Sequence, residues 1–146
     1  MELLFHFEDV DPFFVNKPLV VSAMQRIITD YGFDCGALSI VFCSDDFILN
    51  TNRDYLNHDY YTDIITFDYS ENKIISGDLI VSVDTVKSNA LLYEVDYLDE
   101  LFRVCIHGVL HLVGLVDKTE TEVSLMRERE VFYLGCLTNP FVSRET

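Results

Sequence analysis

The sequence predicts a single α+β domain, in which helices cover a mixed β-sheet of about four strands. The chain has 146 residues, and 49% of them are hydrophobic, which is enough for one substantial core. Segments with strand composition alternate with segments of helical spacing along the chain. No linker-like or low-complexity segment divides the sequence. We therefore expect residues 1–146 to form one domain.

Four segments have the β-branched and aromatic composition of strands. In chain order they are residues 3–7, 37–43, 62–69 and 74–83. A turn at residues 70–73 separates the last two, so these strands can pair as a hairpin. We expect Gly77 and Asp78 to interrupt the fourth strand, because glycine weakens a strand interior.

Five further segments show helical spacing, and each opens at a polar residue that suits a helix N-terminus. These opening residues are Asn16, Ser44, Asp84, Asp96 and Thr119, and the helices end near residues 31, 56, 93, 113 and 136. Thr119 and Glu122 have the spacing of a capping box. Residues 57–61 are predicted as a loop, and the tail from residue 138 as frayed.

The fourth of these helices carries His107 and His111 in an otherwise apolar stretch. Residues four apart lie on one face of a helix, one turn from each other. Residues 104–113 are apolar nearly all round, so this helix should be buried at the centre of the fold. Two buried neutral imidazoles each need a polar partner. They could be hydrogen-bonded core residues, but one shared metal ion would satisfy both rings, and we favour that interpretation.

The residues that follow supply a third ligand. Gly114 can adopt the left-handed conformation that ends a helix, and the chain can then fold back to present Asp117 to the same point. Two imidazoles, one carboxylate and a position open to water are typical of catalytic zinc. Zinc peptidases with this histidine spacing carry a glutamate directly after the first histidine, as general base. Gly108 stands there instead, which argues against a peptidase mechanism.

Residues 107–117 resemble the signature H-G-x-L-H-L-x-G-x-x-H of the YbeY family of rRNA maturation factors, which are described as metal-dependent, single-strand-specific endoribonucleases. Leu49, Asn50 and Arg53, followed by residues 61–67, resemble a second stretch of that family, and residues 77–82 resemble a third. The last ligand departs from the pattern, since Asp117 stands where the family usually has histidine. An aspartate cancels one unit of metal charge and also suits harder metals.

The resemblance implies an α+β fold with a central metal-bearing helix, and one Zn²⁺ or another divalent metal held by His107, His111 and Asp117. It implies cleavage of single-stranded RNA in small-subunit rRNA processing, with ribosomal components as partners. Arg53 would stabilise the charge of the transferred phosphate; without the resemblance, a surface ion pair explains Arg53 better. Asp63 and Asp78 could orient a histidine or accept a proton, and each equally suits a turn. Arg103 lies one turn before His107 and could approach the site.

The charge of the chain opposes RNA binding. Its formal net charge is −15, from 25 acidic and 10 basic residues, whereas phosphate binding normally depends on clustered lysine and arginine. Either the few basic residues converge on one cleft, or a partner such as a ribosomal protein delivers the RNA. Two other functions stay open: a metal-dependent hydrolase of a small or peptide substrate, and a non-catalytic ribosome-assembly factor with a structural metal.

The cellular setting is predicted from what the sequence lacks. No apolar run approaches the length of a membrane span, and no signal segment opens the chain. The four cysteines form no C-x-x-C pair, and we expect reduced, buried thiols. These features favour a cytoplasmic protein that does not contact a membrane.

Overall fold

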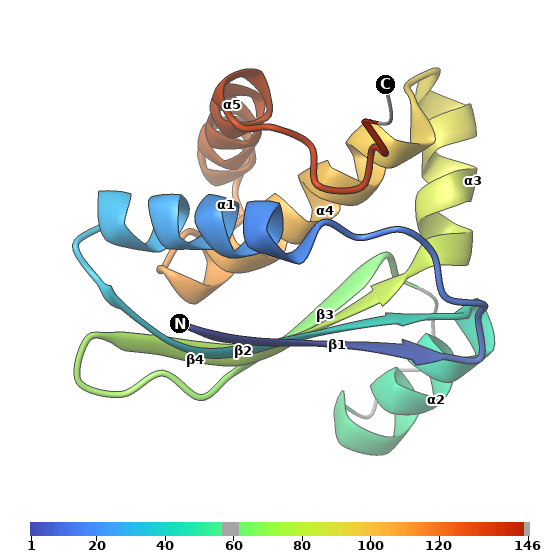
Figure 1. Ribbon diagram of the computed structural model, residues 1–146, viewed down its shortest axis with the longest axis horizontal. Helices are drawn as coiled ribbons and strands as arrows, with labels where there is room; N and C mark the ends of the chain where they lie inside the picture. The colour runs from blue at the N-terminus through green and yellow to red at the C-terminus, as the bar shows by residue number, and fades with distance from the viewer. Residues whose placement is uncertain (57–61, 145–146) are drawn as a thin grey trace.

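The computed structural model describes residues 1–56 and 62–144, and these residues form one sheet covered by helices. The strands are β1 (Glu2–Glu8), β2 (Asp34–Cys43), β3 (Ile64–Asp68) and β4 (Ile74–Ser82), and the helices are α1 (Lys17–Asp30), α2 (Asp45–Leu56), α3 (Val83–Tyr93), α4 (Tyr97–Leu112) and α5 (Glu120–Cys136). Figure 1 shows α1, α3, α4 and α5 on one face of the sheet and α2 on the other. The predicted α+β class is confirmed. The loop predicted at residues 57–61 lies outside the described residues.

The sheet is mixed, in the order β1-β2-β4-β3. β1, β2 and β4 run parallel, and β3 pairs antiparallel with β4, so the predicted hairpin is confirmed. The predicted interruption of the fourth strand is wrong. Gly77 stays in register with Leu38 of β2 on one side and with Asp68 of β3 on the other.

Gly77 does not interrupt β4, because the absence of a side chain lets the neighbouring elements pack close to it. A Cβ atom at this position would lie 2.4 Å from the carbonyl oxygen of Phe67 and 3.0 Å from a methyl group of Leu112. The first contact is with the backbone of the paired strand, which cannot rotate away. Glycine here therefore allows β3 and the end of α4 to pack closely on β4.

Gly77→Ala should therefore destabilise the protein by roughly 1–3 kcal/mol, the usual cost of overpacking a core. Urea denaturation followed by circular dichroism measures the loss. Gly135→Ala is the matched control, because a Cβ atom there meets nothing within 4 Å and alanine favours a helix. Equal stability of Gly77→Ala and wild type would contradict this packing role.

The helix starts follow the predicted caps. Side chains at four of the predicted positions accept a backbone N–H of the first turn: Asn16, Ser44, Asp96 and Thr119. α3 is the exception, because Ser82 rather than Asp84 caps it, with Ser82 Oγ accepting from Thr85 N at 3.3 Å. Among the described helices, none is both long and apolar enough to cross a membrane.

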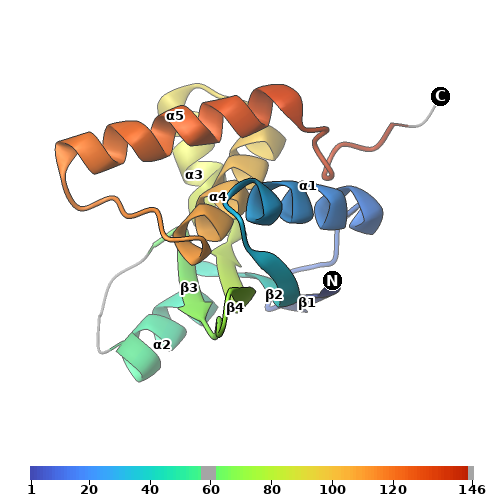
Figure 2. The same cartoon turned by 90° about the vertical axis from the view of Figure 1, so that its left-hand side faces the viewer.

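α4 lies at the centre of the helical layer, as predicted. It packs on β3 and β4 and is flanked by α1, α3 and α5, an arrangement that Figures 1 and 2 show from two directions. Its apolar side chains are buried on several sides, among them Leu101, Ile106 and Leu110, each with no exposed area. The helix that carries the two histidines is therefore held rigidly by the core.

The predicted fraying of the tail is wrong as far as residue 141. Phe141 is only 3% exposed, and its ring packs against Phe42 and Phe102 at centroid distances of 5.7 and 6.3 Å. The side-chain amide of Asn139 donates to the carbonyl of Leu98 at 3.0 Å. A single buried aromatic ring thus anchors a segment that has no regular secondary structure.

The four cysteines are free thiols, but they are not all buried as predicted. Cys43 and Cys105 are buried, and burial raises the pKa of each thiol to about 12. Cys35 is half-buried, and Cys136 is exposed at the end of α5. The prediction is therefore wrong for Cys136, because the last turn of α5 leaves its side chain in solvent.

Candidate metal centre

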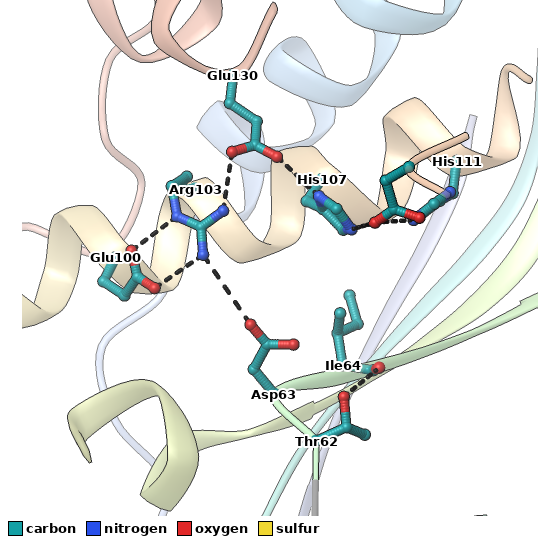
Figure 3. A network of polar contacts seen from close by, with 9 residues as sticks. Thr62, Asp63, Ile64, Glu100, Arg103, His107, His111 and Glu130 are labelled. Atoms are coloured by element: carbon teal, nitrogen blue, oxygen red, sulfur yellow. Dashed lines mark hydrogen bonds and ion pairs between the residues drawn. The ribbon is translucent and has the colours of Figure 1, made fainter. Parts of the chain in front are cut away.

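The two histidines project side by side from α4. Their ring centroids are 4.5 Å apart, with the planes at 84°. Figure 3 shows both rings on the side of α4 that faces the start of β3. Each ring is half-buried, at 19% exposed for His107 and 28% for His111, so each is held by protein yet open to solvent on one side. The spacing of four thus brings the rings together.

Asp117 reaches the same point from the turn after the helix. Gly114, with φ of 109°, ends α4 in the left-handed region that favours glycine. The chain then reverses, and Oδ2 of Asp117 lies 3.4 Å from Nε2 of His107 and 3.5 Å from Nε2 of His111. We call these three residues the His–His–Asp triad; one ligand atom from each lies within 4.8 Å of the others.

The second nitrogen of each ring is already occupied. Nδ1 of His111 lies 2.9 Å from the carbonyl oxygen of Leu115, which can only accept a hydrogen bond. Nδ1 of His107 lies 2.7 Å from a carboxylate oxygen of Glu130, which is likewise an acceptor when ionised. Both rings in their neutral form therefore carry the proton on Nδ1, and the lone pair of each Nε2 faces Asp117.

These distances fit a small divalent cation. Bonds of about 2.0–2.1 Å to nitrogen and oxygen in a tetrahedral site place neighbouring ligand atoms about 3.3 Å apart. The two measured separations, 3.4 and 3.5 Å, are close to that value. Two neutral imidazoles and one carboxylate are also the donor types that zinc and similar metals prefer. The residues present therefore fit the implied metal.

The triad lies in the wall of an open cavity of about 600 Å³. β3 forms another wall through four of its five residues, Ile64, Ile65, Thr66 and Asp68, and α2 contributes Asn52 and Leu56. In the part of the chain that the structure describes, the cavity wall contains three aspartates and no lysine or arginine.

The contacts of His107 lead to a buried network of charges that the sequence did not predict. Glu130 of α5 accepts from His107 through Oε2 and from Arg103 through Oε1, at 2.7 and 2.8 Å. Arg103 also donates two hydrogen bonds to Glu100, at 2.7 and 2.8 Å, and lies 3.9 Å from Asp63 (Figure 3). Burial alone would raise the pKa of Glu130, but the hydrogen bonds from His107 and Arg103 outweigh burial and lower it. Glu130 is therefore ionised at neutral pH.

Of the other three residues considered from the sequence, Arg53, Asp63 and Asp78, one lines the cavity of the triad. Arg53 is exposed on α2, between Asn52 and Leu56 in sequence but outside the set of residues that line the cavity. Asp63 does line the cavity, and burial raises its pKa while Arg103 and His107 partly offset that effect. Asp78 lines a different cavity together with residues of α2, and accepts from the hydroxyl of Tyr69 at 3.1 Å.

Comparison with known proteins identifies the family of the chain and a solved structure of the same fold. A family described as "Endoribonuclease YbeY" matches residues 15–137 of the chain. A protein of that name from Parabacteroides distasonis is 47% identical over 130 residues, which cover 89% of this chain and 92% of the relative. One from Azobacteroides pseudotrichonymphae is 48% identical over 116 residues, covering 80% and 84%. The solution structure of TM1509 from Thermotoga maritima shares the fold, with a TM-score of 0.60 at 23% identity over 89% of this chain and 86% of the other.

Proposed function

The chain belongs to the YbeY endoribonuclease family, and from this we propose that it cleaves single-stranded RNA during ribosomal RNA maturation, at the His–His–Asp triad. One observation carries the proposal: two Nε2 lone pairs and one carboxylate oxygen converge in the wall of an open cavity. A divalent cation bound there would act as a Lewis acid that polarises a phosphoryl oxygen and activates water.

The residues of the triad have distinct parts in this proposal. His107 and His111 offer neutral nitrogen ligands whose orientation is set by their Nδ1 hydrogen bonds. Asp117 is 40% exposed, so it lies on the solvent side of the site and adds one negative charge. We propose Zn²⁺ as the ion, since two imidazoles and one carboxylate form an established zinc ligand set.

The acidity of the chain bears on how RNA reaches the site. The described cavity wall holds no lysine or arginine, and Arg103, which lines a smaller neighbouring cavity with His107 and Asp117, is bound to Glu100 and Glu130. We propose that a basic partner in the small ribosomal subunit supplies the electrostatic attraction that this chain, at net charge −15, lacks. The same proposal places the protein in the cytoplasm, where ribosomal RNA matures.

Cleavage of a defined RNA tests the proposed function. Protein stripped with a chelator should leave a single-stranded oligonucleotide intact, and added Zn²⁺ should restore cleavage. The same strand annealed to its complement should resist under both conditions. Equal cleavage by stripped and restored protein would exclude a metal-dependent mechanism, and equal cleavage of the duplex would exclude single-strand specificity.

We also propose that Arg53 contacts the RNA backbone at the rim of the cavity, since its neighbours Asn52 and Leu56 line the wall. Hydrogen bonds to a charged group contribute about 1.5–3 kcal/mol, so Arg53→Met should lower the apparent affinity for RNA roughly 10- to 100-fold. Arg26→Met is the control, because it removes the same charge from the exposed pair with Asp30 on α1. Similar losses in both variants would mean that only net charge matters.

A further inference from the structure

We propose that Glu130 is a positioning residue for the metal centre, and that Arg103 holds it in place. In this proposal, which rests on the proposed function, Glu130 fixes the proton of His107 on Nδ1 and so directs the Nε2 lone pair toward Asp117. Glu130 belongs to α5 and lies 23 residues from His107 in the chain, yet its Oε2 is 2.7 Å from the ring nitrogen. The contact is short, and the side chain of Glu130 is only 5% exposed.

The two oxygens of Glu130 have separate partners. Oε1 accepts from Nη1 of Arg103 at 2.8 Å, which leaves Oε2 for His107. Figure 3 shows the carboxylate bridging the two side chains of α4 from above. Because an ionised carboxylate only accepts, both neighbours must donate, and His107 in its neutral form can do so only through an Nδ1–H group. The tautomer that leaves Nε2 available therefore follows from the geometry.

Arg103 is committed to this network rather than to a substrate. Its Nε and Nη2 atoms donate to the two oxygens of Glu100, and its Nη1 atom donates to Glu130. This bidentate contact with Glu100, which is 4% exposed and lies one turn earlier on α4, locks the guanidinium plane. Arg103 thus works as an anchor that keeps the carboxylate of Glu130 from rotating away from His107.

Glutamine cannot replace Glu130 in this arrangement, although it has nearly the same shape. Its amide has one acceptor oxygen and one donor NH₂ group. If the oxygen faces Arg103, the NH₂ group faces His107 and favours the tautomer protonated on Nε2, which cannot bind a metal through that atom. If the oxygen faces His107, the NH₂ group faces the Nη1–H group of Arg103, and two donors then oppose each other. The substitution therefore tests the hydrogen-bond pattern while conserving volume.

His111 provides an internal reference within the same protein. Its Nδ1 donates to the backbone carbonyl of Leu115, a contact that no substitution at Glu130 changes directly. Glu128→Gln provides an external one, because it removes an equal charge from an exposed position on the same helix. The ring of His111 should keep its proton on Nδ1 in Glu130→Gln. In Glu128→Gln, both His107 and His111 should keep theirs.

Two measurements test the positioning role of Glu130. The first is NMR spectroscopy of metal-free protein labelled with ¹⁵N-histidine, and the second is a titration of the protein with Zn²⁺. Long-range ¹H–¹⁵N correlation spectra should show His107 and His111 protonated on Nδ1 in wild type. In Glu130→Gln, His107 alone should lose that pattern. Competition with a chromophoric chelator should show Zn²⁺ affinity weakened about 10- to 100-fold in Glu130→Gln, the usual effect of losing such a partner, and unchanged in Glu128→Gln.

The outcomes separate this proposal from the proposed function. A wild-type His107 protonated on Nε2 would overturn the positioning role, and that spectrum requires no variant even if Glu130→Gln does not fold. Unchanged tautomer and affinity in a folded Glu130→Gln protein would overturn it as well. Wild-type protein that shows the expected tautomers but binds no divalent metal would instead overturn the metal centre.

Discussion

Replacing His111 with alanine should abolish metal-dependent RNA cleavage and weaken Zn²⁺ binding by more than about 100-fold. Loss of a residue that only orients a ligand costs 10- to 100-fold in affinity, so loss of a ligand itself should cost more. The remaining two ligand atoms, on His107 and Asp117, are 3.4 Å apart and leave half of a tetrahedral shell to water. Activity should fall to that of the chelator-stripped protein.

The fold should survive this change, because alanine favours the helix and His111 lies near the end of α4. His6→Ala is the matched control, since it removes a histidine that lies in β1 and lines a different cavity. Elemental analysis after gel filtration and the RNA assay measure the two effects. Unchanged zinc content in His111→Ala, with the loss appearing in His6→Ala, would contradict the ligand assignment.

Arg103→Met should destabilise the protein by about 3–5 kcal/mol, although Arg103 is not a member of the triad. Removing one partner of a buried ion pair leaves an uncompensated charge, which costs that much in other proteins. Here Glu100 loses both hydrogen bonds from Arg103, and Glu130 keeps only the one from His107; each of these two residues is 4% exposed. Methionine fills a similar volume, so the loss should come from charge rather than from a cavity. Urea denaturation at pH 7 measures it.

Arg26→Met is the control for this effect, because Arg26 pairs with Asp30 at the surface and should change stability far less.

The effect of Arg103→Met should also depend on pH. In wild type the pKa of Glu130 is lowered, so this group stabilises the fold at neutral pH and loses that contribution as pH falls through the lowered pKa. In Arg103→Met, Glu130 is still buried but has lost the hydrogen bond from Arg103 that favours its ionised form. The pKa of Glu130 should therefore rise. The difference in free energy of unfolding between Arg103→Met and wild type should therefore become smaller toward pH 4. A difference that stays constant with pH would contradict this explanation.

Much of the fold could be predicted because its signals are local. Caps such as Asn16 and Thr119 act on backbone groups three residues away, so the sequence shows both partners. The triad is almost as local, since one helical turn and one glycine turn bring its members together. The motif of residues 107–117 therefore pointed to the geometry that the structure has, although the identity of the ion stays a proposal.

The parts that could not be predicted depend on contacts between distant segments. Glu130 meets His107 only because α5 folds back over α4, and on its own helix it is one of several charged residues. Phe141 anchors the tail through rings of β2 and α4 that no local pattern associates with it. We predicted that Gly77 interrupts a strand, whereas a side chain at this position would collide with a carbonyl oxygen of the neighbouring strand. Tertiary packing decides each of these cases.

Anomalous scattering at the zinc edge, from crystals of protein whose zinc content is known, would test the metal centre most directly. The proposed site predicts one strong peak bonded to Nε2 of His107, Nε2 of His111 and a carboxylate oxygen of Asp117. A zinc-loaded crystal in which the peak lies elsewhere, or in which Asp117 points away from the ion, would contradict it.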